Sequence, residues 1–388
     1  MSWRQLIAAE GRAIFTHPAV LLIVFVGVIF YSFLYPLPYV RDVPIEQQVV
    51  VVNLDGSQLS RRLERMVDAT PQVRLVDHAD TPDEAGRMLL DRHLAGILVI
   101  PEHFHRDLLL GRRPVLSFAG DATYFLVSGT VIEGMNAAAR TLAAEVRAGQ
   151  LLKTGIPQAG LSERMTAVRL NVRPVFNTGM GYVQYVIPAV FVLILHQTLV
   201  MAAGILTAGQ RSRREEDGYW RRCPAWRLLA VRCLVFGLIY AGLVLYYFGP
   251  AFAMYGIDRL ADIGDLWALT VPFLLAAVTL GVCLGRLLAR PEQVTLVVVL
   301  SSMPLVFASG FIWPESAIPP VIVHMVQIVP AVPAIKSFVL LNQMGACLWA
   351  VLPLWGQLWL HCLVYGLLAW ILLGRGKGDP SPDGARGS

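Results

Sequence analysis

Charged residues and cysteines are both scarce in this chain. Only 15% of the residues are Asp, Glu, Lys or Arg, whereas 56% are hydrophobic. This balance is typical of a polytopic membrane protein rather than a soluble domain. The five cysteines all lie after residue 222, so the polar stretch 41–179 can hold no disulfide and depends on its own core. No CxxC pair is present, and His103 and His105 lack a third ligand, so no metal site is predicted.

Motifs for chemistry are missing as well. There is no GxxxxGK[ST] phosphate loop, and the glycine-rich segment 374–378 has the wrong spacing. The chain alone is therefore not expected to hydrolyse ATP. No nucleophile–base arrangement predicts an enzyme. The long apolar runs also lack an Asp or Glu near their centres, which argues against a proton-coupled secondary transporter.

Long apolar runs with unequal spacing are the most informative feature that is present. Each can cross the ~30 Å hydrocarbon layer as a helix, which satisfies its own backbone hydrogen bonds. We predict an α-helical polytopic membrane protein with six transmembrane helices and an inserted extracytoplasmic α/β domain. Residues 19–38 form the first helix, a retained anchor because no small-x-small cleavage site follows. Residues 182–373 form a five-helix domain with runs at 182–208, 228–255, 266–288, 294–313 and 349–373.

The arginines indicate the orientation of these helices. They gather before the first run, between the second and third, between the fourth and fifth, and after the last. The positive-inside rule then places both termini in the cytoplasm and residues 41–179 outside, in the periplasm. This distribution explains the net charge of +5 without nucleic acid; membrane lipid is the expected surrounding. Residues 374–388 are predicted to be a disordered cytoplasmic tail.

Strand-like and helix-like segments alternate in the domain 41–179. Strands are predicted at 49–52, 73–76, 96–100 and 115–118, with helices between them, which favours an α/β domain with some parallel pairing. A longer helix from about 124 to 153 carries one apolar stripe. A stripe on one face does not say what covers it, so its own domain, a second copy and an adaptor protein all remain open.

Several fragments resemble one family. Residues 49–55 (VVVVNLD), 59–63 (LSRRL), 97–104 (ILVIPEHF) and 309–314 (SGFIWP) look like ABC-2-type exporter permeases with a large periplasmic domain between the first two membrane helices. The shared order covers nearly the whole chain. The resemblance implies the bacterial inner membrane, a second permease subunit in a homo- or heterodimer, and a separate ABC ATP-binding subunit that binds ATP and Mg. It also implies, for a tripartite efflux system, a periplasmic membrane-fusion adaptor and an outer-membrane channel.

Residues 209–227 are predicted to form a cytoplasmic coupling loop. Mixed charge and two exposed aromatic residues suit a protein interface, and the resemblance implies a short helix that docks in a groove of the ATPase. The sequence departs from the family's Glu-Arg-Glu-x-Gly-Thr form at Asp217 and Tyr219. The alternative is a positive-inside loop whose aromatic residues lie in the interfacial belt. The candidate residues are Arg213, Arg214, Glu215, Glu216, Asp217, Gly218, Tyr219 and Trp220.

Two further segments are predicted at the membrane surfaces. Residues 1–18, with Glu10 among their polar residues, form an amphipathic elbow helix at the inner surface, the alternative being a frayed tail. Residues 314–348 contain too many prolines for a simple span and predict an outer re-entrant hairpin. That hairpin could be a gate or a structural plug. The residues assigned to this outer region are Gly310, Phe311, Trp313, Pro314 and Lys336.

Polar side chains within the spans offer candidates for the pathway. His196 and Gln197 lie in the second run, and Gln357 and His361 in the last. Such groups turn away from lipid, either to join helices or to line a path. We predict the permease subunit of an ATP-driven exporter for a hydrophobic or amphiphilic substrate. The alternatives are a membrane-anchored receptor or scaffold with an extracytoplasmic binding domain, and a secondary transporter.

Overall fold

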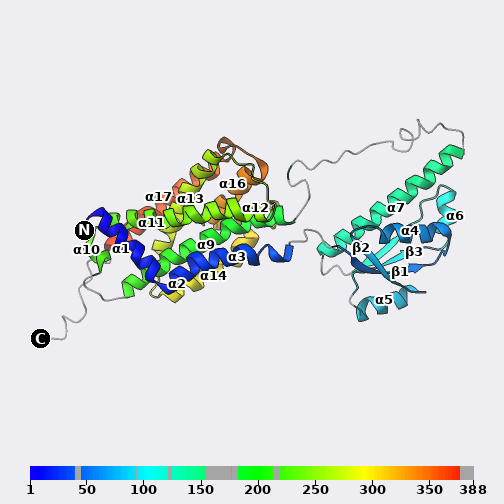
Figure 1. Ribbon diagram of the computed structural model, residues 1–388, viewed down its shortest axis with the longest axis horizontal. Helices are drawn as coiled ribbons and strands as arrows, with labels where there is room; N and C mark the ends of the chain where they lie inside the picture. The colour runs from blue at the N-terminus through cyan, green and yellow to red at the C-terminus, as the bar shows by residue number, and fades with distance from the viewer. Residues whose placement is uncertain are drawn as a thin grey trace. The chain divides into compact units, whose positions relative to one another are not determined.

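The chain divides into two compact units. The computed structural model describes residues 1–39, 45–92, 94–120, 125–153, 176, 182–212 and 218–375. One unit comprises residues 1–40 and 174–388 and is helical, and the other comprises residues 41–173 and contains a sheet (Figure 1).

Six helical stretches in the described part of the helical unit are long and apolar enough to cross a membrane. The fold is therefore that of a polytopic helical membrane protein, as the apolar runs predict. The first stretch contains α2 (Pro18–Leu21), the π-helical turn η1 (Leu22–Gly27) and α3 (Val28–Leu34), followed by the short η2 (Leu37–Tyr39). The others are α9 (Tyr182–Ser212), α11 (Ala225–Tyr246) with η5 (Tyr247–Ala251) and α12 (Phe252–Met254), α13 (Ile263–Leu287), α14 (Pro291–Ala308), and η7 (Leu348–Val351) with α17 (Leu352–Arg375).

Helix α9 lies at the centre of this unit. It is strongly apolar, and 89% of its membrane-spanning part is buried, against 22% for α14 and for α17. Its closest neighbour is α13, where Gly281 and Gly285 lie four residues apart. A Cβ atom at Gly281 would lie 2.6 Å from the carbonyl oxygen of Val200. The two backbones therefore approach closely through a GxxxG pair, as membrane helices do where small residues face each other.

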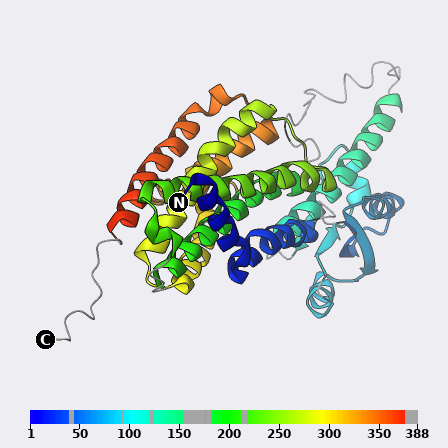
Figure 2. The same cartoon turned by 60° about the vertical axis from the view of Figure 1, so that its left-hand side comes forward.

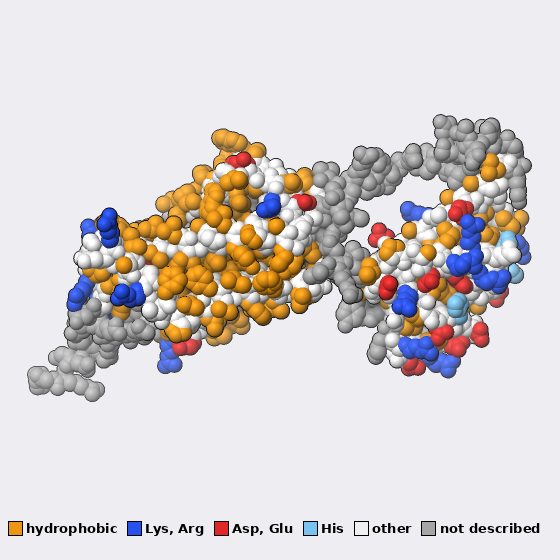
Figure 3. Space-filling view, viewed as in Figure 1, with side chains coloured by type: hydrophobic (Ala, Val, Ile, Leu, Met, Phe, Trp, Pro, Cys, Tyr) orange, Lys and Arg blue, Asp and Glu red, His pale blue; other side chains and the backbone are white. Residues whose placement is uncertain are grey.

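The surface of the helical unit is predominantly apolar. Hydrophobic side chains cover its long sides, and basic side chains, which the sequence identifies as arginines, gather at the end that carries α1 and α10 (Figure 3). Phe30, Leu300 and Leu363 are among the large apolar residues that are more than half exposed. So extensive an exposed apolar surface requires lipid or another protein to cover it.

The N-terminal helix α1 (Trp3–Thr16) precedes the first span and is bent away from it (Figure 2). It begins at Ser2, whose side chain forms a capping box with Gln5, and it ends where Pro18 starts the next helix. The predicted helix is thus present. Its buried face consists of Leu6, Glu10 and Ile14, so a carboxylate lies on the face that the apolar pattern assigns to packing.

A bent helix pair lies between α14 and α17. After the short turn η6 (Glu315–Ala317), α15 (Pro320–Val326) and α16 (Ala331–Met344) meet at 92°. Pro330 and Pro333 at the bend fit this break, because proline interrupts helical hydrogen bonding. The end of α16 is joined to the segment before α13, where the Leu260 amide donates to the Asn342 carbonyl at 3.0 Å.

The second unit is a four-stranded sheet with helices on both faces. Its strands are β1 (Gln47–Asn53), β2 (Val73–His78), β3 (Gly96–Ile100) and β4 (Ser117–Gly120), in the order β2-β1-β3-β4. The pairs β1–β2 and β1–β3 are parallel, which confirms the predicted parallel pairing, and β3–β4 is antiparallel. The helices are α4 (Gln58–Asp68), α5 (Pro82–Asp91), α6 (Phe104–Leu109) and α7 (Phe125–Lys153).

Strand β1 separates two small cores. Val49 and Val51 pack with α4, α6 and α7 on one face, whereas Val50 and Val52 pack with the α5 side on the other. The apolar stripe of α7 belongs to the first core through Val131, Met135, Ala138 and Leu142. Its own unit therefore covers this stripe.

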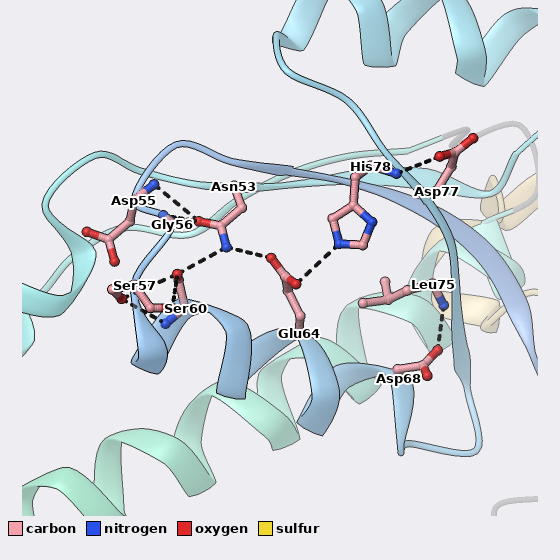
Figure 4. A network of polar contacts seen from close by, with 10 residues as sticks. All are labelled: Asn53, Asp55, Gly56, Ser57, Ser60, Glu64, Asp68, Leu75, Asp77 and His78. Atoms are coloured by element: carbon pink, nitrogen blue, oxygen red, sulfur yellow. Dashed lines mark hydrogen bonds and ion pairs between the residues drawn. The ribbon is translucent and has the colours of Figure 1, made fainter.

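A polar network fixes the turn after β1. The Asn53 side chain accepts from the Gly56 amide at 2.9 Å and donates to Ser60 Oγ at 3.0 Å (Figure 4). It also donates to Glu64, whose other carboxylate oxygen lies 3.2 Å from His78 Nε2. The network connects the ends of β1 and β2 to α4 and leaves little freedom at this edge of the sheet.

Candidate functional site

A buried ion pair joins the N-terminal helix to the bundle. Glu10 in α1 accepts from Arg232 Nε in α11 at 2.5 Å, and Arg232 Nη2 lies 3.3 Å from the other carboxylate oxygen. Both side chains are fully buried, with 0% exposed. This two-point geometry is the strong form of a guanidinium–carboxylate contact.

The remaining donors of Arg232 are bound by α9. Its Nη1 donates to Thr207 Oγ1 at 2.8 Å, and its Nη2 donates to Gln210 Oε1 at 2.6 Å. Buried charges are tolerated only where such bonds replace water. The guanidinium thus holds α1, α9 and α11 together at one point.

Tyr219 connects the short helix α10 (Tyr219–Arg222) to the same point. Its hydroxyl donates to Glu10 Oε2 at 2.6 Å and accepts from Gln210 Nε2 at 2.7 Å. Burial, followed by the negative charge of Glu10, raises the pKa of Tyr219. The phenol therefore keeps its proton at physiological pH and remains a donor. We call Glu10, Thr207, Gln210, Tyr219 and Arg232 the Glu10 network.

The start of α10 is shaped by Gly218 and Trp220. A Cβ atom at Gly218 would lie 2.6 Å from the Trp220 indole, so the ring covers the glycine. Tyr219 and Trp220 are both half-buried and pack against the core of their own unit. The prediction of two exposed aromatic residues is therefore wrong, because hydrogen bonds and packing hold Tyr219 and packing covers Trp220. The other predicted coupling residues, Arg213, Arg214, Glu215, Glu216 and Asp217, lie outside the described residues.

The predicted polar residues of the spans lie in two different settings. Gln357 donates to the carbonyl and the side-chain oxygen of Gln327 at 3.0 Å, so it joins α17 to the bend between α15 and α16. His196 is buried, and neither of its ring nitrogens has a hydrogen-bond partner among the described residues. The same holds for Nε2 of Gln197 and Nδ1 of His361. Gln357 thus joins helices, whereas the other three present unsatisfied polar atoms inside the bundle.

The predicted outer residues lie around the bent helix pair. Lys336 in α16 forms an ion pair with Glu315, and the carbonyl of Phe311 accepts from the Tyr185 hydroxyl of α9. Gly310 has a φ of 88°, which glycine adopts without strain. Trp313 is 58% exposed, and Pro314 is also exposed. Side-chain contacts thus connect this region to α9 and α16.

Sequence reasoning missed the central residues of the Glu10 network. Arg232 is the only charged residue in the apolar run 228–255, and a lone cation in a span predicts a buried partner. That signal was available for the arginine. Glu10 lies 222 residues away in the chain, in a helix that reads as a surface element, so its role could not be assigned.

A bundle of helices long and apolar enough to span a membrane, with a separate α/β unit, defines a polytopic membrane protein. The sequence profile described as ABC-2 family transporter protein matches residues 18–371. The chain therefore belongs to the ABC-2 family of transporter proteins. No curated protein matches it.

Membership of this family confirms the resemblance found in the sequence. The chain is a multi-pass membrane protein and the permease component of an ABC system. Such a component is not itself catalytic, and the family implies that it works with an ABC ATP-binding subunit.

Proposed function

We propose that this chain forms the translocation pathway of an ATP-driven exporter for a hydrophobic or amphiphilic substrate. Two permease subunits, identical or paralogous, enclose the pathway in the bacterial inner membrane, and partner ATPases bind ATP and Mg. Both termini and the coupling loop 209–227 lie in the cytoplasm, and the domain 41–179 lies in the periplasm. The arginines at the α1 and α10 end of the bundle support this orientation.

The observation that carries the proposal is the attachment of α10 to the Glu10 network. Through Tyr219, this helix contacts Glu10 of α1 and Gln210 of α9, and through Glu10 it reaches Arg232 of α11. A force applied to α10 by an ATPase is therefore transmitted to α1 and to the membrane helices α9 and α11. A two-state pathway changes its affinity for substrate only if the two states bind it differently. The network supplies a rigid connection for such a change.

The other end of the bundle supplies a candidate gate. The ion pair between Lys336 and Glu315 links α16 to the turn η6, and Gln357 holds the bend from α17. Polar links that break and re-form suit a hairpin that opens during export. The periplasmic domain would contact a membrane-fusion adaptor and, through it, an outer-membrane channel, because it is a folded module with a core of its own.

The test is ATP hydrolysis and export by the complex with its ATPase partner. We expect an ABC ATPase to co-purify with the permease. The variant Tyr219→Phe should lower export by about tenfold, because it removes a hydrogen bond to a buried charge. Tyr31→Phe, at a tyrosine that is 37% exposed, is the matched control and should retain export. Reversing the charges of Glu215 and Glu216 should weaken ATPase binding.

Each alternative function has its own signature in the same assays. ATP hydrolysis by the single purified chain would contradict the proposal that a separate subunit hydrolyses ATP. Export driven by a proton gradient in the absence of ATP would indicate a secondary transporter. A chain that binds a ligand but neither recruits an ATPase nor exports would be a receptor or scaffold.

A further inference from the structure

Four arginines line one cavity at the end of the bundle that carries α10. The cavity has a volume of about 560 Å³ and is lined by Arg211 of α9, Arg221 of α10, Arg286 of α13 and Arg375 of α17. Among the described residues, no Asp or Glu lines it. Four helices thus bring four positive charges to one space, and the described part of its wall holds no negative charge.

These charges lack the compensation that Arg232 has. Arg211 donates to the backbone carbonyl of Arg286 at 2.5 Å, and Arg286 donates to the carbonyl of Leu372 at 3.2 Å. Backbone carbonyls orient a guanidinium but do not neutralise it. Within the described ranges, no ion pair connects any of the four arginines to a carboxylate. The cavity therefore favours an anion.

The cavity lies at the level where membrane helices end. Helices α9, α13 and α17 end at Ser212, Leu287 and Arg375, and each is long and apolar enough to span the bilayer. The neighbouring side chains of Leu287 and Ile371 are 59% and 38% exposed. Positive charge thus adjoins apolar surface, the arrangement that a phospholipid with a negative headgroup requires.

We propose that this cavity binds the phosphate of an acidic phospholipid. Guanidinium groups bind phosphate oxygens through paired hydrogen bonds, and basic pockets between membrane helices are known sites for anionic headgroups. The volume suits a headgroup and is too small for a folded domain. Thr207 and Gln210 also line the cavity and belong to the Glu10 network, so the lipid would contact the same side chains that hold Arg232.

The experiment uses the purified full chain in detergent. Native mass spectrometry would count adducts of phosphatidylglycerol and of phosphatidylcholine with identical acyl chains. We expect phosphatidylglycerol adducts to exceed phosphatidylcholine adducts by at least about tenfold, and this preference to disappear in the double variant Arg211→Gln/Arg375→Gln. The control variant Arg4→Gln/Arg12→Gln removes the same amount of charge from exposed positions of α1. It should retain the preference for phosphatidylglycerol.

Further variants and competitors keep the result decisive. Arg375→Gln alone, at an exposed residue of the last helical turn, should lower the preference even if the double variant folds poorly. Equal binding of the two lipids, or an equal loss in the α1 control, would overturn the proposal. So would displacement of the lipid by inorganic phosphate at an ionic strength matched with chloride, which would show a simple anion site. If the arginine variants lost ATPase binding but kept the lipid preference, the cavity would be a protein contact and not a lipid site.

Discussion

The Glu10–Arg232 pair illustrates how much one buried charge depends on its neighbours. Moving either ion out of water costs several kcal/mol, and only close contact with full hydrogen bonding offsets that cost. Here Thr207 and Gln210 bind the guanidinium, and Tyr219 binds the carboxylate. Removing one charge leaves the other uncompensated, whereas removing both leaves no buried charge and costs only the packing and the hydrogen bonds of the neutral partners.

Glu10→Gln tests this dependence. We expect a loss of about 3–5 kcal/mol in the free energy of unfolding, because Arg232 stays buried without a counter-charge. Denaturation of the detergent-solubilised chain would measure it. Glu292→Gln, at an exposed position in the first turn of α14, should change stability by no more than about 0.5 kcal/mol.

The double variant Glu10→Leu/Arg232→Met separates charge from packing. It should recover much of the lost stability, because apolar residues of similar size can replace a buried ion pair. It should still fail to restore export, because the Tyr219 hydroxyl then has no carboxylate to bind. A single variant as stable as the wild type would mean that water reaches the pair.

At the scale of elements, the sequence predicts the helices and strands whose limits depend on local residue patterns. The membrane helices follow from run length, and β1 to β3 follow from apolar segments close to their observed bounds. The fourth strand was expected at 115–118 but pairs from Ser117 to Gly120. Its limits are determined by its partner β3, in the register Val99 to Ser117, and no local pattern carries that information.

The contact between α9 and α13 was likewise not predicted, although its signal is visible. Gly281 and Gly285 form a small-xxx-small pair, but the motif does not name the helix it faces. Gly281→Val should therefore force α9 and α13 apart and cost about 1–3 kcal/mol by overpacking. The denaturation midpoint in detergent should fall. Gly242→Val in α11, where a Cβ atom meets nothing within 4 Å, is the control, and an equal effect of both changes would argue against close packing.

At the scale of the whole molecule, the direction of insertion is not contained in the helices themselves. Span length and packing are the same for either orientation, so the prediction rests on the arginines alone. Arg4 and Arg12 lie in α1, Arg286 lies in the last turn of α13, and Arg290 lies between α13 and α14. The family implies an ATP-binding partner, and the docking at α10 that we propose for it would place this end of the bundle in the cytoplasm.

Cys347 offers a direct measurement of this orientation. It is the only exposed cysteine of the five, all of which the structure describes, and it follows α16 on the outer side of the proposed topology. A membrane-impermeant maleimide added to intact spheroplasts should label it, and Cys347→Ser should abolish the labelling. In that background, Ser117→Cys in the α/β unit should restore labelling from outside. Arg290→Cys should react only after permeabilisation, because it lies at the arginine-rich end. Labelling of Arg290→Cys in intact spheroplasts would place α10 outside the cell, where no ATPase could act on the Glu10 network.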